Sequence, residues 1–89
     1  MAFEWDPNQA RSNLREHRVS FETAKKVFDD DAAFEIRDDS AEEERWKYVG
    51  RIGTAIFVVV YTERGDNIRI ISARRATRSE KDAYYQQAG

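Results

Sequence analysis

The feature that most constrains the fold is an uninterrupted apolar run at residues 55–61, Ala-Ile-Phe-Val-Val-Val-Tyr. β-Branched and aromatic residues favour strands, and a run without polar alternation is typical of a strand that is buried on both faces or lies at the centre of a sheet. The run is the longest in the sequence, and seven residues are too few to cross a bilayer. We therefore expect a sheet built around this strand.

A second, isoleucine-rich strand is predicted at residues 68–74, after a hairpin connection at residues 62–67 that contains Arg-Gly-Asp. Strict alternation predicts two faces for it, one with Ile68, Ile70 and Ser72 and the other with Arg69, Ile71 and Ala73.

This strand leads directly into the signal for a last helix. Thr77 has Glu80 three positions later, which predicts a capping box and a helix over residues 77–87. The apolar content of that helix is thin, so core packing alone cannot dock it strongly.

The N-terminal third of the chain predicts a short strand and two helices. Asp6 followed by Pro7 is a helix N-cap signal that ends the strand at residues 3–5 and begins a helix that reaches about Glu16. Ser20 caps a second helix, which Asp29 and its two following aspartates end. The apolar stripe of that second helix is Phe21, Ala24, Val27 and Phe28.

Two further strands are predicted between these helices and the central run. Residues 33–37 alternate, residues 38–44 form an acidic loop, residues 45–49 alternate again, and residues 50–54 make a turn or bulge. The order is β-α-α-β-β-β-β-α. We expect one α+β domain over residues 1–89, with an antiparallel sheet, the first two helices on one of its faces, and a C-terminal helix.

Charge is distributed unevenly along the chain, although the net charge is only −2. Residues 29–44 hold nine acids and one base, whereas residues 64–81 hold six bases and two acids. The basic block is compatible with nucleic-acid binding, and both blocks are also compatible with solvated faces. The absence of cysteine excludes disulfides and thiolate zinc sites, and the single histidine excludes most histidine-based metal sites. With no signal peptide pattern, we expect a soluble, cytoplasmic protein.

Arginine is the main candidate for chemistry. A guanidinium group offers five donors in a planar fork, and Arg69, Arg74 and Arg75 are expected to converge near the start of the last helix, which itself favours anions. Cleavage of RNA needs charge stabilisation on the phosphate and proton transfer at two oxygens. The proton-transfer candidates are Glu80, Tyr84 and His17. Each has a structural alternative: a capping box for Glu80, core packing for Tyr84, and a helix C-cap or packed ring for His17. The arginines have an alternative role in salt bridges to the acidic block.

Several motifs resemble the BrnT-type toxins of type II toxin–antitoxin systems. They are Phe-Glu-Trp-Asp-Pro at residues 3–7, Asn13, His-Arg-Val-Ser-Phe at residues 17–21, and Ile-Arg-Ile-Ile-Ser-Ala-Arg-Arg-Ala-Thr at residues 68–77, followed by Glu80 and Tyr84. The resemblance implies a RelE-like fold and a metal-independent endoribonuclease that arrests translation and growth. It also implies a BrnA-type antitoxin with a ribbon-helix-helix part, in a hetero-oligomer that represses its own operon. Arg18 stands where the family commonly has glycine, so it must adopt a left-handed conformation at a cost or avoid it.

Under the hypothesis of a ribonuclease toxin, we expect two sets of functional residues, with no metal and no cofactor. The catalytic set is Arg45, Arg69, Arg74, Glu80 and Tyr84. The RNA-binding set is His17, Arg64, Arg75 and Arg78. The alternative hypothesis is a non-catalytic module that binds RNA or protein.

Overall fold

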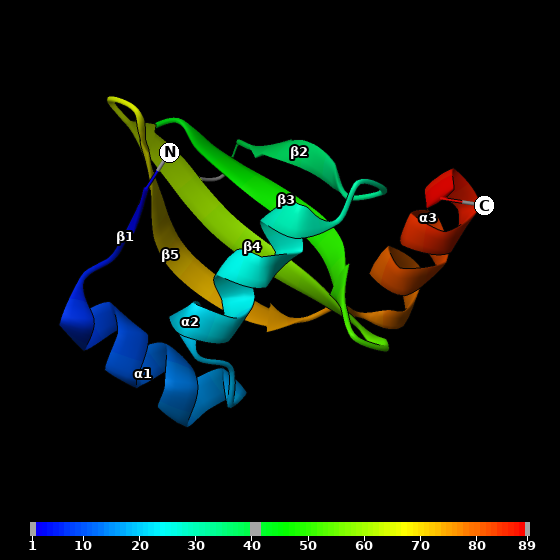
Figure 1. Cartoon of the computed structure of the whole chain (residues 1–89), viewed down its shortest axis with the longest axis horizontal. Helices are drawn as coiled ribbons and strands as arrows, with labels where there is room; N and C mark the ends of the chain where they lie inside the picture. The colour runs from blue at the N-terminus through cyan, green and yellow to red at the C-terminus, as the bar shows by residue number, and fades with distance from the viewer. Residues whose placement is uncertain (1, 40–41, 89) are drawn as a thin grey trace.

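The computed structural model describes residues 2–39 and 42–88 and shows a five-stranded sheet with helices on both of its faces (Figure 1). In chain order the elements are β1 (Phe3–Glu4), α1 (Pro7–His17), α2 (Phe21–Ala24), the 3₁₀ helix η1 (Lys25–Asp29), β2 (Phe34–Asp38), β3 (Arg45–Ile52), β4 (Ala55–Arg64), β5 (Asn67–Arg75) and α3 (Arg78–Ala88). The part of the predicted acidic loop at residues 40–41 lies outside the described residues.

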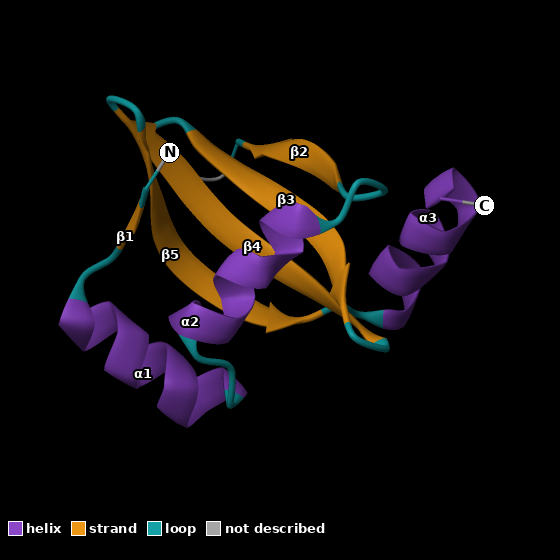
Figure 2. Cartoon of the chain, in the orientation of Figure 1, coloured by secondary structure: helices purple, strands orange, loops and turns teal. Residues whose placement is uncertain are grey.

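The apolar run at residues 55–61 forms most of β4, and β4 lies at the centre of the sheet, as predicted. The strand order is β1-β5-β4-β3-β2, so β4 is paired on both sides (Figure 2). Val58 and Val59 are both almost fully buried, although they point to opposite faces. The Arg-Gly-Asp tripeptide lies in the tight turn between β4 and β5, where Gly65 has a positive φ of 59°.

The prediction of a purely antiparallel sheet is wrong, because β1 pairs parallel to β5. The sheet is therefore mixed. The other three pairings are antiparallel, and the predicted order of helices and strands otherwise holds except for η1. Alternation within a strand reports which side chains are buried, but it carries no information on the direction of the neighbouring strand.

Two predicted boundaries also change. The second helix is only one α-helical turn, Phe21–Ala24, and continues as η1. The predicted turn at residues 50–54 is wrong in its first half, because β3 continues through Gly50 to Ile52. A Cβ on Gly50 would lie 3.1 Å from the Cβ of Ala33 and 3.3 Å from that of Val27, so the absence of a side chain lets η1 pack closely on β3.

A β-bulge in β5 changes the predicted faces of that strand. Tyr61 pairs with Ile70 but Val60 pairs with Ser72, so Ile71 is an extra residue that shifts the alternation. Ile70 and Ala73 consequently lie on the same face and are both fully buried. Ile68 and Ile70 share a face, as predicted, but the prediction that Ser72 lies on that face is wrong, because Ser72 points to the opposite face.

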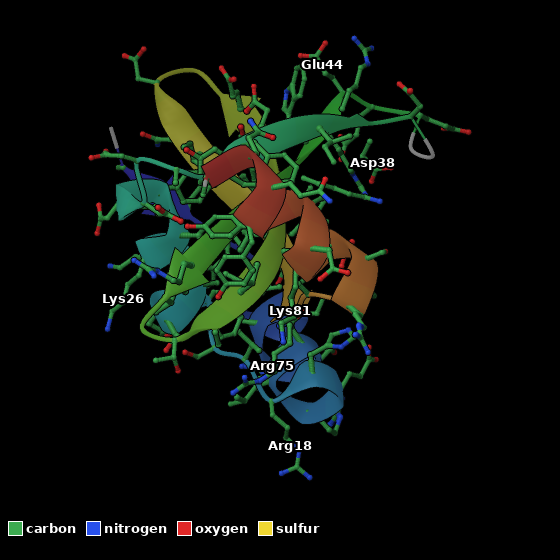
Figure 3. All side chains as sticks on the ribbon, turned by 90° about the vertical axis from the view of Figure 1, so that its right-hand side faces the viewer. Arg18, Lys26, Asp38, Glu44, Arg75 and Lys81 are labelled. Atoms are coloured by element: carbon green, nitrogen blue, oxygen red, sulfur yellow. The ribbon has the colours of Figure 1, made fainter. Side chains whose placement is uncertain are left out.

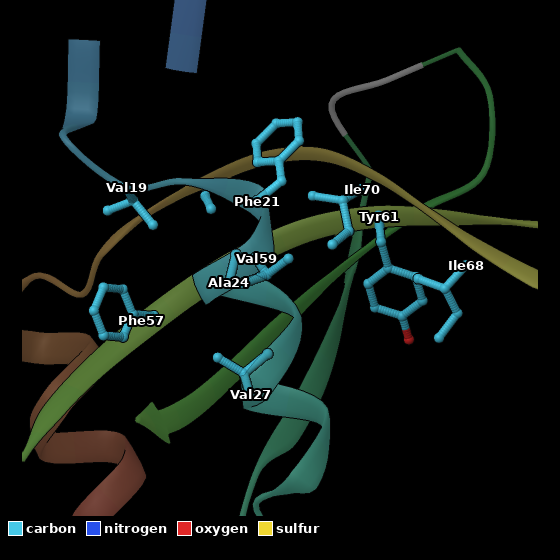
Figure 4. Close-up of a cluster of buried hydrophobic side chains, with 10 residues drawn as sticks. Val19, Phe21, Ala24, Val27, Phe57, Val59, Tyr61, Ile68 and Ile70 are labelled. Atoms are coloured by element: carbon cyan, nitrogen blue, oxygen red, sulfur yellow. The ribbon is translucent and has the colours of Figure 1, made fainter. Parts of the chain in front are cut away.

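The main core lies between α1, α2 and η1 and the face of the sheet that carries Ile70 and Ala73. Phe21, Ala24 and Val27 from the helical segment pack on apolar side chains of the central strands (Figure 4), which are Phe57, Val59, Tyr61, Ile68, Ile70 and Ala73. A smaller cluster on the opposite face holds Val49, Ile56 and Val58 under Tyr84 of α3. The two N-terminal helices thus cover one face, as predicted, and α3 covers one end of the other.

The side chain of Asn13 joins α1 to β5 just after the bulge. Its amide nitrogen donates to the carbonyl oxygens of Ala73 (2.8 Å) and Val19 (2.9 Å), and its amide oxygen accepts from the Ala73 N–H (3.0 Å). Asn13 is the one buried polar residue in the described chain. It supplies to the edge of β5 the hydrogen bonds that a neighbouring strand would otherwise make.

The turn after α1 contains a left-handed residue that is not glycine. Arg18 has φ 61° and ψ 26°, and its N–H donates to the Leu14 carbonyl as a helix C-cap. Of the two alternatives for this position, Arg18 takes the left-handed conformation, which costs about 1 kcal/mol relative to glycine.

We predict that Asn13→Ala lowers the free energy of unfolding by about 2–4 kcal/mol, because it leaves buried N–H and C=O groups of Ala73 and Val19 without their partner. Urea denaturation measures this change. Ser12→Ala, at the neighbouring position on α1, is the control and is expected to cost less than about 0.5 kcal/mol. Equal losses in the two variants would contradict the role assigned to Asn13.

Candidate functional site

Basic side chains project from the sheet face that α1 and α2 do not cover, including two from β3 and two from β5. Arg45, Lys47 and the buried Val49 are every second residue of β3, so their side chains share one face of the sheet. Arg69 and Arg74 lie on this same face, because they pair with Thr62 and Val58 of β4. We call Arg45, Lys47, Arg69 and Arg74 the basic face. The bulge creates it, because in a regular strand Arg69 and Arg74 would point to opposite faces.

Three of the predicted arginines meet in one cleft of about 290 Å³ at the hairpin end of the basic face. Arg45 comes from β3, Arg64 from the end of β4, and Arg69 from β5. The other lining residues of this arginine cleft are Gln9, Glu43, Thr62, Glu63 and Ile71. Arg74 lies outside the cleft, about 13 Å farther along the sheet, since four residues of β4 separate the partners of Arg69 and Arg74.

Carboxylates hold the two cleft arginines of the basic face. Nη1 of Arg69 lies 3.0 Å from Oε2 of Glu4, and Nη2 of Arg45 lies 3.0 Å from Oε1 of Glu43. Hydrogen bonds from Asn67 and then from Arg69 hold the pKa of Glu4 below its usual value. A guanidinium group has five donors, so it can contact a carboxylate and a phosphate at the same time.

Arg74 forms a bidentate pair with Glu80 on the first turn of α3. The two bonds are Nη1 to Oε1 at 2.8 Å and Nη2 to Oε2 at 2.9 Å. The Arg74 bonds are the main cause that lowers the pKa of Glu80 to about 2, helped by the N–H of Thr77. Glu80 also forms the predicted capping box, because its Oε1 accepts from the Thr77 N–H and its own N–H donates to Thr77 Oγ1. At neutral pH Glu80 is an ionised acceptor and cannot donate a proton.

Tyr84 lies under α3, away from the lining of the arginine cleft. Its side chain is 3% exposed and packs on Val58, and its hydroxyl donates to Oδ2 of Asp30 at 2.6 Å. Burial, and then this bond to a carboxylate, raise the pKa of Tyr84. Asp30 also accepts from the backbone N–H of Arg51 at 2.7 Å. Tyr84 therefore fastens α3 to the loop after η1.

The remaining predicted residues are spread around this site. His17 lines a shallow groove between α1 and β5, and this groove shares Gln9 and Ile71 with the arginine cleft. The guanidinium carbon of Arg75 lies 5.5 Å from the centre of the Phe57 ring. Figure 3 shows Arg75 near Lys81 beside the start of α3, and Arg78 is the exposed first residue of that helix. The structure does not bring these residues into the arginine cleft.

Three residues that the sequence did not single out belong to the site. Lys47 lies on the basic face between the row of Arg45 and the row of Arg74, and alternation along β3 was sufficient to find it. Gln9 and Thr62 line the cleft, but no sequence signal identifies them because they come from α1 and β4.

The described residues show neither a candidate metal site nor a candidate membrane-spanning helix. Within residues 2–39 and 42–88, no group of three or more His, Cys, Asp or Glu side chains is placed to hold a metal ion. No helix in the same part of the chain is long and apolar enough to cross a membrane.

Several guanidinium groups on one open sheet face are an arrangement that can bind anions, and their spacing along two strands is compatible with a chain of phosphate groups. Residues 5–80 match the family model described as "Ribonuclease toxin, BrnT, of type II toxin-antitoxin system". The match covers most of the chain, and the chain belongs to this family of ribonuclease toxins. A comparison with curated proteins found no match.

The Arg74–Glu80 pair makes a prediction for pH dependence. The pKa of Glu80 is lowered from 4.5 to about 2 on folding, so its contribution to stability is present above about pH 4.5 and is lost as the pH falls towards 2. We expect Glu80→Gln to lower the free energy of unfolding by about 1–2 kcal/mol at pH 7, after allowance for solvent screening. The difference from the parent should shrink between about pH 4.5 and 2.

Chemical denaturation at several pH values measures this difference. Asp82→Asn is the matched control, because Asp82 is an exposed carboxylate on the same helix. A Glu80→Gln effect that stays constant over the whole pH range would show that the ion pair is not its source.

Proposed function

We propose that the protein is an endoribonuclease toxin that cleaves RNA and thereby arrests translation and growth. The observation that carries this proposal is the convergence of Arg45, Arg64 and Arg69 in one cleft, with Arg74 on the same face of the sheet. Membership of the ribonuclease toxin family supports the choice of RNA as the polyanion. We also propose that the sheet and helices form a RelE-like fold.

The proposed mechanism places the scissile phosphate in the arginine cleft. Arg69 and Arg45 bind its oxygens and stabilise the charge that develops when the neighbouring 2′-hydroxyl attacks the phosphorus. The bond to the 5′-oxygen breaks, which leaves a 2′,3′-cyclic phosphate and a 5′-hydroxyl end, and solvent carries the proton from the attacking hydroxyl to the leaving oxygen. The carboxylate partners of Arg69 and Arg45 hold the guanidinium groups in place before the substrate arrives. Arg74 lies too far along the sheet to contact the phosphate that is bound in the cleft. We therefore assign Arg74, together with Lys47, to a neighbouring phosphate of the same RNA chain. Arg64 lines the cleft, and His17 lines the neighbouring groove beside α1. Arg75 and Arg78 lie at the α3 end of the sheet, away from the cleft, so we propose them only as contacts for more distant parts of the RNA.

The proton-transfer groups suggested by the sequence are Glu80 and Tyr84. The low pKa of Glu80 makes its carboxylate a weak base as well as an ineffective acid at neutral pH, and its bonds to Arg74 and Thr77 favour a role in positioning Arg74. The buried hydroxyl of Tyr84, which is bonded to Asp30, favours a role in holding α3. Because the substrate supplies its own nucleophile and the arginines supply positive charge, we propose that cleavage needs no metal ion.

One observation favours the alternative of a non-catalytic binding module. Each of Arg45, Arg69 and Arg74 is paired with a carboxylate, which reduces the positive potential of the basic face. A module of this kind would bind RNA without cutting it, and its affinity would fall steeply with salt.

We predict that Arg69→Ala lowers the rate of RNA cleavage by about 10²–10³, the loss typical for removal of a donor that stabilises an anion. Arg74→Ala should weaken binding and lower the rate less. Gel analysis of a defined RNA incubated with purified protein measures both effects, and chelation with EDTA should leave the parent rate unchanged. Arg37→Ala is the control, because Arg37 is an ion-paired strand arginine on the opposite face, next to Trp46.

Two results would count against this proposal. If Arg69→Ala and Arg74→Ala both cleave at the parent rate, the basic face is not the active site. If the parent binds the RNA in a salt-dependent way and no fragments form, the binding module is the better description.

We further propose that a BrnA-type ribbon-helix-helix antitoxin neutralises the protein, in a hetero-oligomer that represses the shared operon. The family description, which places the chain in a toxin–antitoxin system, supports a partner. The acidic segment at residues 29–44 suits a lysine- and arginine-rich protein.

Coexpression with the neighbouring open reading frame tests this partner. We expect the two proteins to copurify, the complex to cleave RNA far more slowly than the free toxin, and the complex to bind operator DNA. An unrelated ribbon-helix-helix protein is the control and should do none of these. If the toxin purifies alone and keeps its full activity, the partner has been assigned wrongly.

A further inference from the structure

A hollow of about 570 Å³ lies at the hairpin end of the sheet and has no role in the proposed cleavage. It opens on the face that α2 and η1 cover. Three aromatic rings and one aliphatic side chain form its apolar wall, and residues of the β4–β5 hairpin form its rim. The aromatic pocket is lined by Phe28, Tyr48, Tyr61, Ile68, Glu63, Gly65, Asp66 and Asn67.

The rings of the aromatic pocket hold one another in fixed positions. Phe28 stacks on Tyr48 with ring centres 4.6 Å apart, and its edge meets Tyr61 at 5.2 Å. Tyr61 is buried beside Ile68 at one end of the main core (Figure 4), whereas Phe28 and Tyr48 are only half-buried. Partly exposed π-faces on a rigid wall can contact a ligand, and the face of an aromatic ring attracts cations.

The charges around the aromatic pocket are negative. Glu63 and Asp66 lie on its rim, and the hydroxyl of Tyr61 donates to the carboxylate of Glu35. Among the described residues that line the pocket, none is basic. Burial raises the pKa of Tyr48, and the nearby carboxylates of Glu35 and Asp30 add to this effect. The pocket therefore repels phosphate, in contrast to the arginine cleft.

We propose that the aromatic pocket receives a lysine or arginine side chain of a partner protein. A long cationic side chain has an apolar stem that fits between Phe28, Tyr48 and Ile68, and a charged head that Glu63 and Asp66 attract. A nucleotide fits less well, because its base could stack on the rings only by bringing a phosphate close to these two carboxylates.

The position of the pocket connects it to the RNA site. Glu63 lines both the aromatic pocket and the arginine cleft, so a partner anchored in the pocket lies against the rim of the cleft. A toxin can be blocked in this way without any contact to its catalytic arginines. We take this partner to be the antitoxin, and that identification rests on the proposed function. The preference of the pocket for a cationic side chain does not depend on the proposed function.

Titration of the ¹⁵N-labelled protein with small probes tests this preference by NMR. The probe is Nα-acetyl-lysine amide, and Nα-acetyl-norleucine amide is the uncharged control with a similar stem. We expect saturable shifts at residues 63–68 and around Tyr48 with the lysine probe, and weaker binding of the norleucine probe. Tyr48→Leu should weaken lysine binding by about 2- to 30-fold, the range that corresponds to a cation–π contact. Tyr48→Phe, which keeps the ring, should retain it, and Asp66→Asn should weaken it.

Three outcomes would overturn the proposal: no saturable shifts in the pocket, equal binding of the norleucine probe, or binding of uridine monophosphate in the same pocket in preference to lysine. A spectrum with the dispersion of the parent shows that each variant is folded. RNA cleavage is not the readout, so failure here leaves the ribonuclease proposal standing, and an inactive ribonuclease leaves this result interpretable.

Discussion

One extra residue in β5 determines how both faces of the sheet are used. Without Ile71 as a bulge, Ala73 would leave the core and Arg69 and Arg74 would point to opposite sides. The bulged strand is fixed from its edge by Asn13, which bonds both backbone groups of Ala73. The packing of α1 and the arrangement of the arginines therefore depend on the same few hydrogen bonds. A change in register would disturb stability and the basic face together.

Pairing with carboxylates is the second constraint on the arginines. A flexible guanidinium side chain loses rotamer freedom when it binds, and a partner that already fixes it removes part of that cost. Arg69 is fixed by Glu4 from the parallel strand β1, and Arg74 by Glu80 from α3, so elements at both ends of the chain organise β5. The same pairs reduce the charge available to RNA. The guanidinium groups of the basic face are thus held in defined positions, but the positive electrostatic potential of the face is reduced by their carboxylate partners. This combination favours direct contacts to phosphate groups over long-range electrostatic attraction of RNA.

The sequence predicts the parts of this structure that depend on local patterns. The central position of β4, the caps at Asp6, Ser20 and Thr77, and the turn at Gly65 each follow from a few neighbouring residues. The bulge at Ile71 and the parallel direction of β1 do not, because both depend on contacts between distant segments. The Glu4–Arg69 pair likewise joins residues 65 positions apart. Residue type alone identifies the arginines as candidates, but their division between the arginine cleft and the ion pair with α3 depends on tertiary contacts.

The attachment of α3 has a consequence for how the molecule opens. One buried ring, one bidentate ion pair and one tyrosine–aspartate bond hold this helix, and the exposed remainder of it adds little burial. A segment with so few anchors has a low free energy of sub-global unfolding, so its amides exchange with solvent sooner than those of β4. Its release uncovers Val49, Ile56 and Val58 next to Arg74. In any state in which α3 is released, this apolar strip and the basic face form one continuous surface.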